Sequence, residues 1–217
     1  MIDTILFDFD GTLMDTNNII IESWQHTFRT LEGREESLER LIPTFGEPLS
    51  RTMAEFFPNI PVEESIEVYR SFQRDHFTGY IELFPGVKEM VHEAKAAGYK
   101  TAIVTSRLVN TTTEALTKFG IIDDFDVIVT PEDTDKHKPD PEPALVALRK
   151  LGAKPENAVM LGDTMFDILC ANNAGVKSVL VGWTFALKGW TDEDFGDDKP
   201  SLRLENPEDL ITMLRNE

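Results

Sequence analysis

Two aspartates near the N-terminus stand in a pattern that suits phosphoryl chemistry. Asp8 and Asp10 lie in the run DFDGT at 8–12, directly after the apolar residues 4–7. Side chains two apart on a strand point the same way, so both carboxylates would share one edge of a pocket, and Gly11 lets the chain turn away. Such a pair can supply a nucleophile, an acid/base and ligands for a divalent cation. A plain turn is the alternative, since Asp and Gly are common in loops.

A second acidic pair follows another apolar run. Residues 162–167 read GDTMFD, so Asp163 stands at an expected strand end and Asp167 follows one helical turn later. Asp163 taken alone could simply cap a helix. Two acidic pairs at two strand ends favour a hard-cation site, and oxygen ligands without a Cys/His cluster favour Mg²⁺.

Hydroxyl and cationic groups complete the set of candidate residues. Thr105, Ser106 and Arg107 follow the apolar run before them, and a hydroxyl with backbone N–H groups at a helix start can hold a phosphate. Lys138 lies in the proline-rich segment 136–143, whose prolines restrict the backbone and could aim the lysine. A solvated lysine and a solvent-facing arginine are the alternatives.

Strands and helices alternate along most of the chain, which is typical of βαβ units and a parallel sheet. The fold class is therefore α/β, a doubly wound, Rossmann-like parallel sheet. In such sheets a site lies at the carboxyl ends of the strands, near the point where strand order reverses. The expected strands are 4–8, 100–105, 126–130, 157–162 and 177–182, and the expected helices are 86–96, 110–119, 141–151, 165–174 and one from 207.

The segment 16–81 differs from the rest of the chain. Ile20, Trp24 and Phe28 recur at helical spacing, further helices are expected downstream, and no strand-like alternation occurs. We expect an all-helical insert over 16–81 and a core made of 1–15 and 82–217. The acidic, turn-rich residues 189–200 are expected to form an exposed loop.

Composition excludes several classes of partner. The net charge is −18 over 217 residues, which argues against nucleic acid or an anionic membrane surface. A phosphate site here must therefore be locally positive. No apolar run approaches a membrane span, and the N-terminus has no signal-peptide pattern. The single cysteine, Cys170, suits a reducing compartment and is read as a packing residue, so we expect a cytoplasmic protein.

Together these motifs resemble the haloacid dehalogenase superfamily of aspartate-dependent phosphohydrolases. The family's first motif, D-x-D-G-T, matches residues 8–12, its hydroxyl residue matches Thr105, its lysine matches Lys138, and its acidic motif matches 162–167. The order and spacing also match, and the helical insert corresponds to the family's helical cap. The core resemblance covers nearly the whole chain.

The resemblance implies a role for each matched residue. Asp8 would attack phosphorus and form an aspartyl phosphate, and Asp10 would act as acid and then base. Mg²⁺ would be held by the Asp8 and Asp163 carboxylates and the Asp10 backbone carbonyl, with Asp167 supporting the metal from outside its ligand shell. Thr105 and Lys138 would hold the phosphoryl oxygens. We also expect substrate contacts from Gly11, Thr12, Ser106 and Arg107.

Within the family, the substrate is expected to be a small phosphorylated molecule and the protein a monomer. The related β-phosphoglucomutases carry a cap histidine where this chain has Ile20, which favours hydrolysis over a phosphomutase reaction. Several stretches resemble bacterial inorganic pyrophosphatases, whose relatives include phosphoglycolate phosphatases. Pyrophosphate, phosphoglycolate and sugar phosphates all stay open as substrates, and a non-catalytic binding module is the alternative from another class.

Overall fold

The computed structural model describes residues 1–184, 186–187 and 189–216. The chain folds into two compact units, one formed by Met1–Met14 with Leu83–Glu217 and the other by Asp15–Glu82. The chain passes between them through β2 (Met14–Asp15) and β3 (Glu82–Leu83), which pair as a two-stranded sheet. No helix among the described residues combines the length and apolarity needed to cross a membrane.

The first unit is built on a six-stranded sheet with the order β5-β4-β1-β6-β7-β8. Its neighbouring strands pair in parallel, and β1 lies where the strand order reverses. This is the doubly wound α/β core expected from the sequence. The strands are β1 (Thr4–Phe7), β4 (Lys100–Val104), β5 (Val127–Val129), β6 (Ala158–Gly162), β7 (Lys177–Val181) and β8 (Leu202–Leu204).

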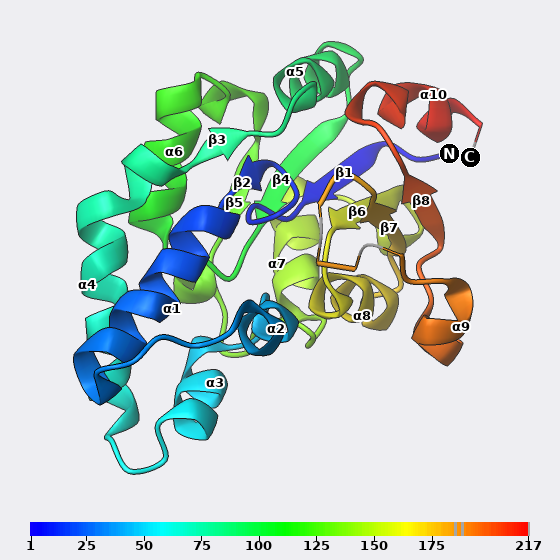
Figure 1. The fold of residues 1–217 in the computed structure, drawn as a ribbon. Helices are drawn as coiled ribbons and strands as arrows, with labels where there is room; N and C mark the ends of the chain where they lie inside the picture. The colour runs from blue at the N-terminus through cyan, green and yellow to red at the C-terminus, as the bar shows by residue number, and fades with distance from the viewer. Residues whose placement is uncertain (185, 188, 217) are drawn as a thin grey trace. The chain divides into compact units, whose positions relative to one another are not determined.

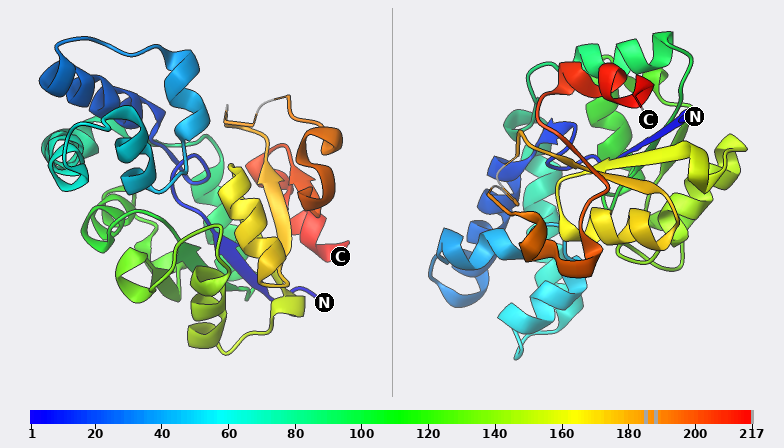
Figure 2. Two further views of the ribbon diagram at one scale, coloured as in Figure 1. Left: turned by 90° about the horizontal axis from the view of Figure 1, so that it is seen from below. Right: turned by 90° about the vertical axis from the view of Figure 1, so that its right-hand side faces the viewer.

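Helices cover both faces of this sheet (Figures 1 and 2). One face carries α7 and α8, and the other carries α5 and α10. The inner strands are almost wholly buried, which explains why they read as short apolar runs rather than alternating patterns. The helices are α5 (Val87–Ala96), α6 (Val109–Phe119), α7 (Glu142–Leu151), α8 (Met165–Asn173), α9 (Asp192–Phe195) and α10 (Leu210–Arg215).

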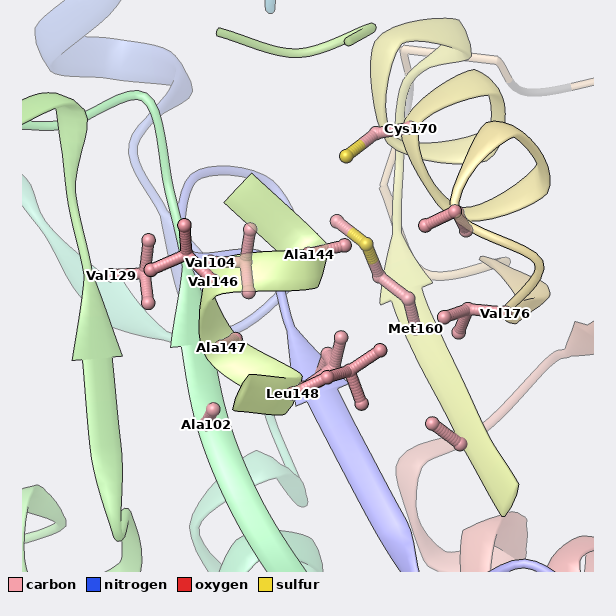
Figure 3. Close-up of a cluster of buried hydrophobic side chains, with 14 residues drawn as sticks. Ala102, Val104, Val129, Ala144, Val146, Ala147, Leu148, Met160, Cys170 and Val176 are labelled. Atoms are coloured by element: carbon pink, nitrogen blue, oxygen red, sulfur yellow. The ribbon is translucent and has the colours of Figure 1, made fainter. Parts of the chain in front are cut away.

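A buried hydrophobic cluster joins α7 and α8 to the sheet (Figure 3). Val104 and Met160 contribute from the strands, Leu148 from α7 and Cys170 from α8. Burial raises the pKa of the Cys170 thiol to about 12, so this cysteine is a packing residue, as its apolar neighbours in the sequence indicated.

Two elements of this unit differ from the expectation. The edge strand β8 was not expected, because Leu202–Leu204 offers only a short Leu-Arg-Leu run that becomes a strand by pairing with β7. The segment 189–200 is not entirely loop, since it contains α9, whose N-terminus is capped by Thr191 and Asp194.

The second unit is all helical. Its helices are α1 (Asn17–Glu32), α2 (Leu38–Leu41), α3 (Leu49–Phe56) and α4 (Val62–Tyr80). Aromatic side chains form its core: Trp24 meets Phe56 edge-on at 5.3 Å between ring centroids, and Phe28 lies 4.7 Å from Phe57. The hydrophobic spacing of the sequence therefore marks the buried faces of these helices.

Candidate active site

The register of the central strands places the candidate residues side by side. Phe7 pairs with Ile103 of β4 and with Leu161 of β6. Asp8 therefore lies level with the last residues of both neighbouring strands. Thr105 and Asp163 each follow one residue further, so three segments distant in sequence meet at the carboxyl edge of the sheet.

Lys138 is buried against two of the predicted carboxylates. Its Nζ donates to Asp8 Oδ1 and Asp167 Oδ1, both at 2.5 Å, and to the Val104 carbonyl oxygen at 3.3 Å. Its side chain is only 5% exposed. The solvated lysine considered from the sequence is therefore wrong, and Lys138 is a buried cation beside the candidate nucleophile.

Hydrogen bonds around Lys138 fix the segment that carries it. The Asp140 backbone N–H donates to the His137 carbonyl at 2.9 Å, and the Glu142 N–H donates to the Asp140 carboxylate at 3.0 Å. From the other side, Asn173 donates to the Pro139 carbonyl at 3.2 Å. The segment between β5 and α7 thus holds the lysine in place, which a flexible surface loop would not do.

Asp167 uses both carboxylate oxygens within the protein. One accepts from Lys138, and the other accepts from the backbone N–H of Thr164 at 3.1 Å and from its hydroxyl at 2.6 Å. This capping box begins α8. Gly162 makes room for it, because a Cβ there would overlap the Asp167 side chain. Asp167 therefore orients Lys138 and the start of α8.

Asp163 has one oxygen held and one unsatisfied. Its Oδ2 accepts from the Thr184 hydroxyl at 3.3 Å, whereas its buried Oδ1 has no hydrogen-bond partner within the described part of the chain. Gly11, at φ 79°, lies so close that a Cβ on it would overlap the Asp163 carboxylate. A buried carboxylate oxygen without a partner is costly, and a cation would satisfy it.

The acidic cluster has strongly perturbed ionisation. Oxygens of Asp8, Asp163 and Asp167 lie within 4.8 Å of one another. Burial, followed by the charge of Asp167, raises the pKa of Asp8 to about 7 even though Lys138 opposes the shift. Burial, followed by Asp167 and Asp8, raises the pKa of Asp163 well above its ordinary value. Burial disfavours the charged lysine, but Asp167 and Asp8 outweigh it and raise the pKa of Lys138.

This donor set fits Mg²⁺. It consists of carboxylate oxygens alone, includes the unsatisfied Asp163 Oδ1, and carries three acidic groups against one ammonium. Hard oxygen ligands with excess negative charge suit a hard divalent cation. It would offset the burial and the mutual repulsion that raise the pKa values of Asp8 and Asp163. Because both oxygens of Asp167 are already engaged, Asp8 and Asp163 are the better ligands.

Asp10 points to a different partner. Arg107 Nε lies 3.0–3.1 Å from both Asp10 oxygens, and Arg107 Nη2 lies 2.7 Å from Oδ1. The arginine side chain is 6% exposed and the aspartate side chain 26% exposed. The solvent-facing arginine considered from the sequence is therefore wrong. This fork-like pair fixes the orientation of the Asp10 carboxylate.

The remaining predicted site residues differ in their exposure to solvent. Thr105 is buried, and its hydroxyl accepts from the Arg107 backbone N–H at 3.0 Å. Ser106 is exposed. Thr12 is fully buried, and its hydroxyl has no partner among the described residues.

Two residues that contact the site were not predicted. Trp183 Nε1 donates to the Thr12 carbonyl at 2.9 Å, and Thr184 holds Asp163. Both follow β7, which pairs with β6. The signal that could have found them is their position after an expected parallel strand, at the edge where the other candidates lie.

Comparison of this chain with known proteins identifies the family that its motifs resemble. The model of the haloacid dehalogenase-like hydrolases matches residues 5–181. A protein named pyrophosphatase PpaX from Bacillus cereus (strain B4264) is 39% identical over 215 residues, covering 99% of this chain and 97% of its own length. The chain therefore belongs to the haloacid dehalogenase-like hydrolase family and is a hydrolase.

Solved structures agree with this fold. One from Lactobacillus plantarum, provisionally described as a phosphoglycolate phosphatase, is 26% identical with a TM-score of 0.81, covering 98% of this chain and 99% of its own. CbbY from Rhodobacter sphaeroides, in complex with phosphate, is also 26% identical with a TM-score of 0.81, covering 97% and 96%. The similarity extends over both units of the chain.

Proposed function

We propose that this protein is a Mg²⁺-dependent phosphohydrolase of small phosphorylated compounds, with inorganic pyrophosphate as the first candidate substrate. The observation that carries the proposal is the buried group in which Lys138 bridges Asp8 and Asp167. Beside it lies Asp163, whose Oδ1 has no hydrogen-bond partner among the described residues. The name of the Bacillus cereus relative favours pyrophosphate.

The first half of the reaction would transfer the phosphoryl group to the protein. An Asp8 oxygen forms a bond to phosphorus as the bond to the leaving oxygen breaks. Asp10, in the protonated form that the second half of the cycle regenerates, gives its proton to that oxygen. Lys138 would shift from Asp8 toward the phosphoryl oxygens, with the Thr105 region as a second donor. Asp8, Asp163 and the Asp10 carbonyl would hold Mg²⁺, which supplies positive charge against those oxygens when bound.

The second half would release phosphate. Asp10, now ionised, takes a proton from water, whose oxygen attacks the phosphorus of the aspartyl phosphate. The Asp8–phosphorus bond breaks, which restores the Asp8 carboxylate and frees inorganic phosphate. In both halves one Asp10 oxygen must turn to the leaving oxygen or to water, while Arg107 keeps hold of the other.

The helical unit would act as a cap, with 16–81 as the inserted segment and 1–15 with 82–217 as the catalytic core. A cap of this kind restricts a site to small substrates and excludes water from the reaction. We further propose a monomer in the cytoplasm, in keeping with the buried, unpaired Cys170.

A substrate panel tests the proposal. Purified protein with MgCl₂ is assayed for phosphate release from pyrophosphate, phosphoglycolate, hexose phosphates and p-nitrophenyl phosphate. We expect Asp8→Asn to lower the rate roughly 10³-fold or more, because the amide is a poor nucleophile. Absence of phosphate release from every substrate would contradict the proposal, as would an Asp8→Asn variant with the wild-type rate.

Phosphoglycolate phosphatase is the second candidate, favoured by the provisional description of the Lactobacillus plantarum structure. The panel separates it from pyrophosphatase by the ratio of kcat/KM for the two substrates. Sugar-phosphate interconversion without net phosphate release would instead indicate a phosphomutase, and binding without turnover would indicate a non-catalytic module.

A further inference from the structure

The residues after β7 make two contacts with the candidate metal site, one with Asp163 and one with the loop 8–12. Gly182 continues the sheet by donating its backbone N–H to Leu204 at 2.9 Å. A Cβ at Gly182 would crowd Glu205, whose Oε2 would lie 2.5 Å away. The next two residues then turn toward the carboxyl edge, where Asp163 and the loop 8–12 lie.

The Thr184 hydroxyl donates to Oδ2 of Asp163, whereas Oδ1 is the oxygen without a partner among the described residues. Thr184 is 6% exposed, and its hydroxyl lies 3.3 Å from Asp163 Oδ2. Because Oδ2 is engaged and Gly11 packs against the same carboxylate, the carboxylate has little freedom to rotate. Oδ1 is thereby left as the oxygen available to a cation.

Trp183 acts on the loop that carries Asp8 and Asp10. Its indole N–H donates to the Thr12 carbonyl at 2.9 Å across a separation of 171 residues in the chain. The same loop closes on itself, because the Gly11 N–H donates to the Met14 carbonyl at 2.8 Å. The indole bond ties this closed loop to the segment after β7.

We propose that Thr184 and Trp183 are positioning residues of the metal site: Thr184 orients Asp163, and Trp183 fixes the loop that carries Asp8 and Asp10. This inference rests on the proposed Mg²⁺ site. Groups that hydrogen-bond to metal ligands commonly change metal affinity 10–100-fold when they are removed. Neither residue touches the reacting atoms, so each acts through its partner.

The test is direct titration of MgCl₂ into the protein by calorimetry, without substrate. We expect Thr184→Val, which keeps the shape and removes the hydroxyl, to weaken Mg²⁺ binding about tenfold. Thr184→Ser restores the hydroxyl and should bind within about threefold of wild type. A Thr184→Val variant with wild-type affinity would overturn the proposal, and so would a Thr184→Ser variant as weak as Thr184→Val.

Thr101→Val is the matched control. Thr101 is fully buried at the opposite end of β4. Its hydroxyl donates to the Asp124 carbonyl oxygen at 2.6 Å and lies 3.3 Å from Asp126 Oδ2, so Thr101→Val also removes a buried hydroxyl that contacts a carboxylate. We expect this variant to lower the melting temperature without changing Mg²⁺ affinity. Equal weakening by both variants would show a general stability effect and overturn the assignment of Thr184.

Trp183→Phe tests the second contact. The ring is kept and the N–H is lost, so we expect kcat at saturating Mg²⁺ to fall about tenfold while KM changes less than about threefold. An unchanged kcat would overturn the role of Trp183. Wild-type protein that binds no Mg²⁺ would contradict the proposed metal itself, an outcome distinct from wild-type binding that Thr184→Val leaves intact.

Discussion

At the scale of single residues, two buried basic side chains form ion pairs with the carboxylates of the site. Lys138 forms ion pairs with Asp8 and Asp167, and Arg107 binds Asp10 through Nε and Nη2. The two cations differ in kind: the ammonium is a point charge that a phosphoryl group can share, whereas the guanidinium fixes a plane. The candidate nucleophile and the candidate acid/base are thus held by separate partners.

Arg107 should matter through its geometry as well as its charge. We expect Arg107→Lys to lower kcat/KM for pyrophosphate about tenfold, because a lysine cannot form the fork to Asp10, and Arg107→Met to lower it further. Steady-state kinetics on the two variants checks this. Arg149→Met, on the exposed side of α7, is the surface control and should behave as wild type. Full activity of Arg107→Met would contradict the role.

Binding of Mg²⁺ should be strongly pH-dependent. The pKa of Asp8 is raised to about 7 and that of Asp163 is also raised, so the folded protein holds protons that the unfolded chain releases near pH 4. Stability without metal is therefore lost as the pH rises toward 7, and Mg²⁺ must displace these protons. The ionisation of Asp8 alone should raise the Mg²⁺ affinity roughly 30-fold between pH 5.5 and 8.

Calorimetric titration in buffers of different ionisation enthalpy measures both the affinity and the protons released. We expect more protons to be released at pH 5.5 than at pH 8, together with a larger Mg²⁺-induced rise in melting temperature at pH 8. Equal affinity at the two pH values would show that Asp8 and Asp163 are already ionised in the metal-free protein.

At the scale of elements, the start of α8 links the helix to the site. Asp167 caps the helix through Thr164 and holds Lys138 with its other oxygen. Gly162, the last residue of β6, has no side chain where the Asp167 carboxylate packs. A side chain at Gly162 should therefore disturb both the capping of α8 by Asp167 and the position of Lys138.

Gly162→Ala tests this link. The added Cβ overlaps Asp167, so we expect the unfolding free energy to fall by about 1–3 kcal/mol and phosphatase activity to fall with it. Gly79→Ala in α4 is the matched control, because no heavy atom lies within 4 Å of its added Cβ. It should stabilise the helix by about 0.5–1 kcal/mol. Denaturant unfolding of both variants decides the matter, and an unchanged Gly162→Ala midpoint would refute the link.

At the scale of the whole molecule, the charge of −18 opposes an anionic substrate outside the site. Salt screens such long-range repulsion over a Debye length of about 10 Å at 0.1 M. At fixed free Mg²⁺, we therefore expect kcat/KM for pyrophosphate to rise about twofold or more between 10 and 150 mM KCl, with kcat unchanged. A fall in kcat/KM over this range would mean that local cations dominate the approach of the substrate.

Much of the fold could be predicted because its strands and helices are local patterns. Short apolar runs bounded by turns predicted β1, β4, β5, β6 and β7, and hydrophobic spacing predicted the helices of the second unit. The edge strand β8 could not be predicted, because a run of three residues with a central arginine becomes a strand only when β7 lies beside it.

From the sequence alone one can predict which chemical groups follow the strands. Asp8, Asp10 and Asp163 come directly after a strand, Asp167 follows one helical turn later, and Lys138 lies in the segment before α7. Strand periodicity and parallel order are enough to bring such ends to one edge. How these groups pair depends on the folding of the whole chain. Three of these pairings depend on contacts between distant segments. Lys138 is buried between Asp8 and Asp167. Arg107 binds Asp10 across 97 residues, and Thr184 binds Asp163. No local propensity encodes these contacts, because they arise from packing around the sheet.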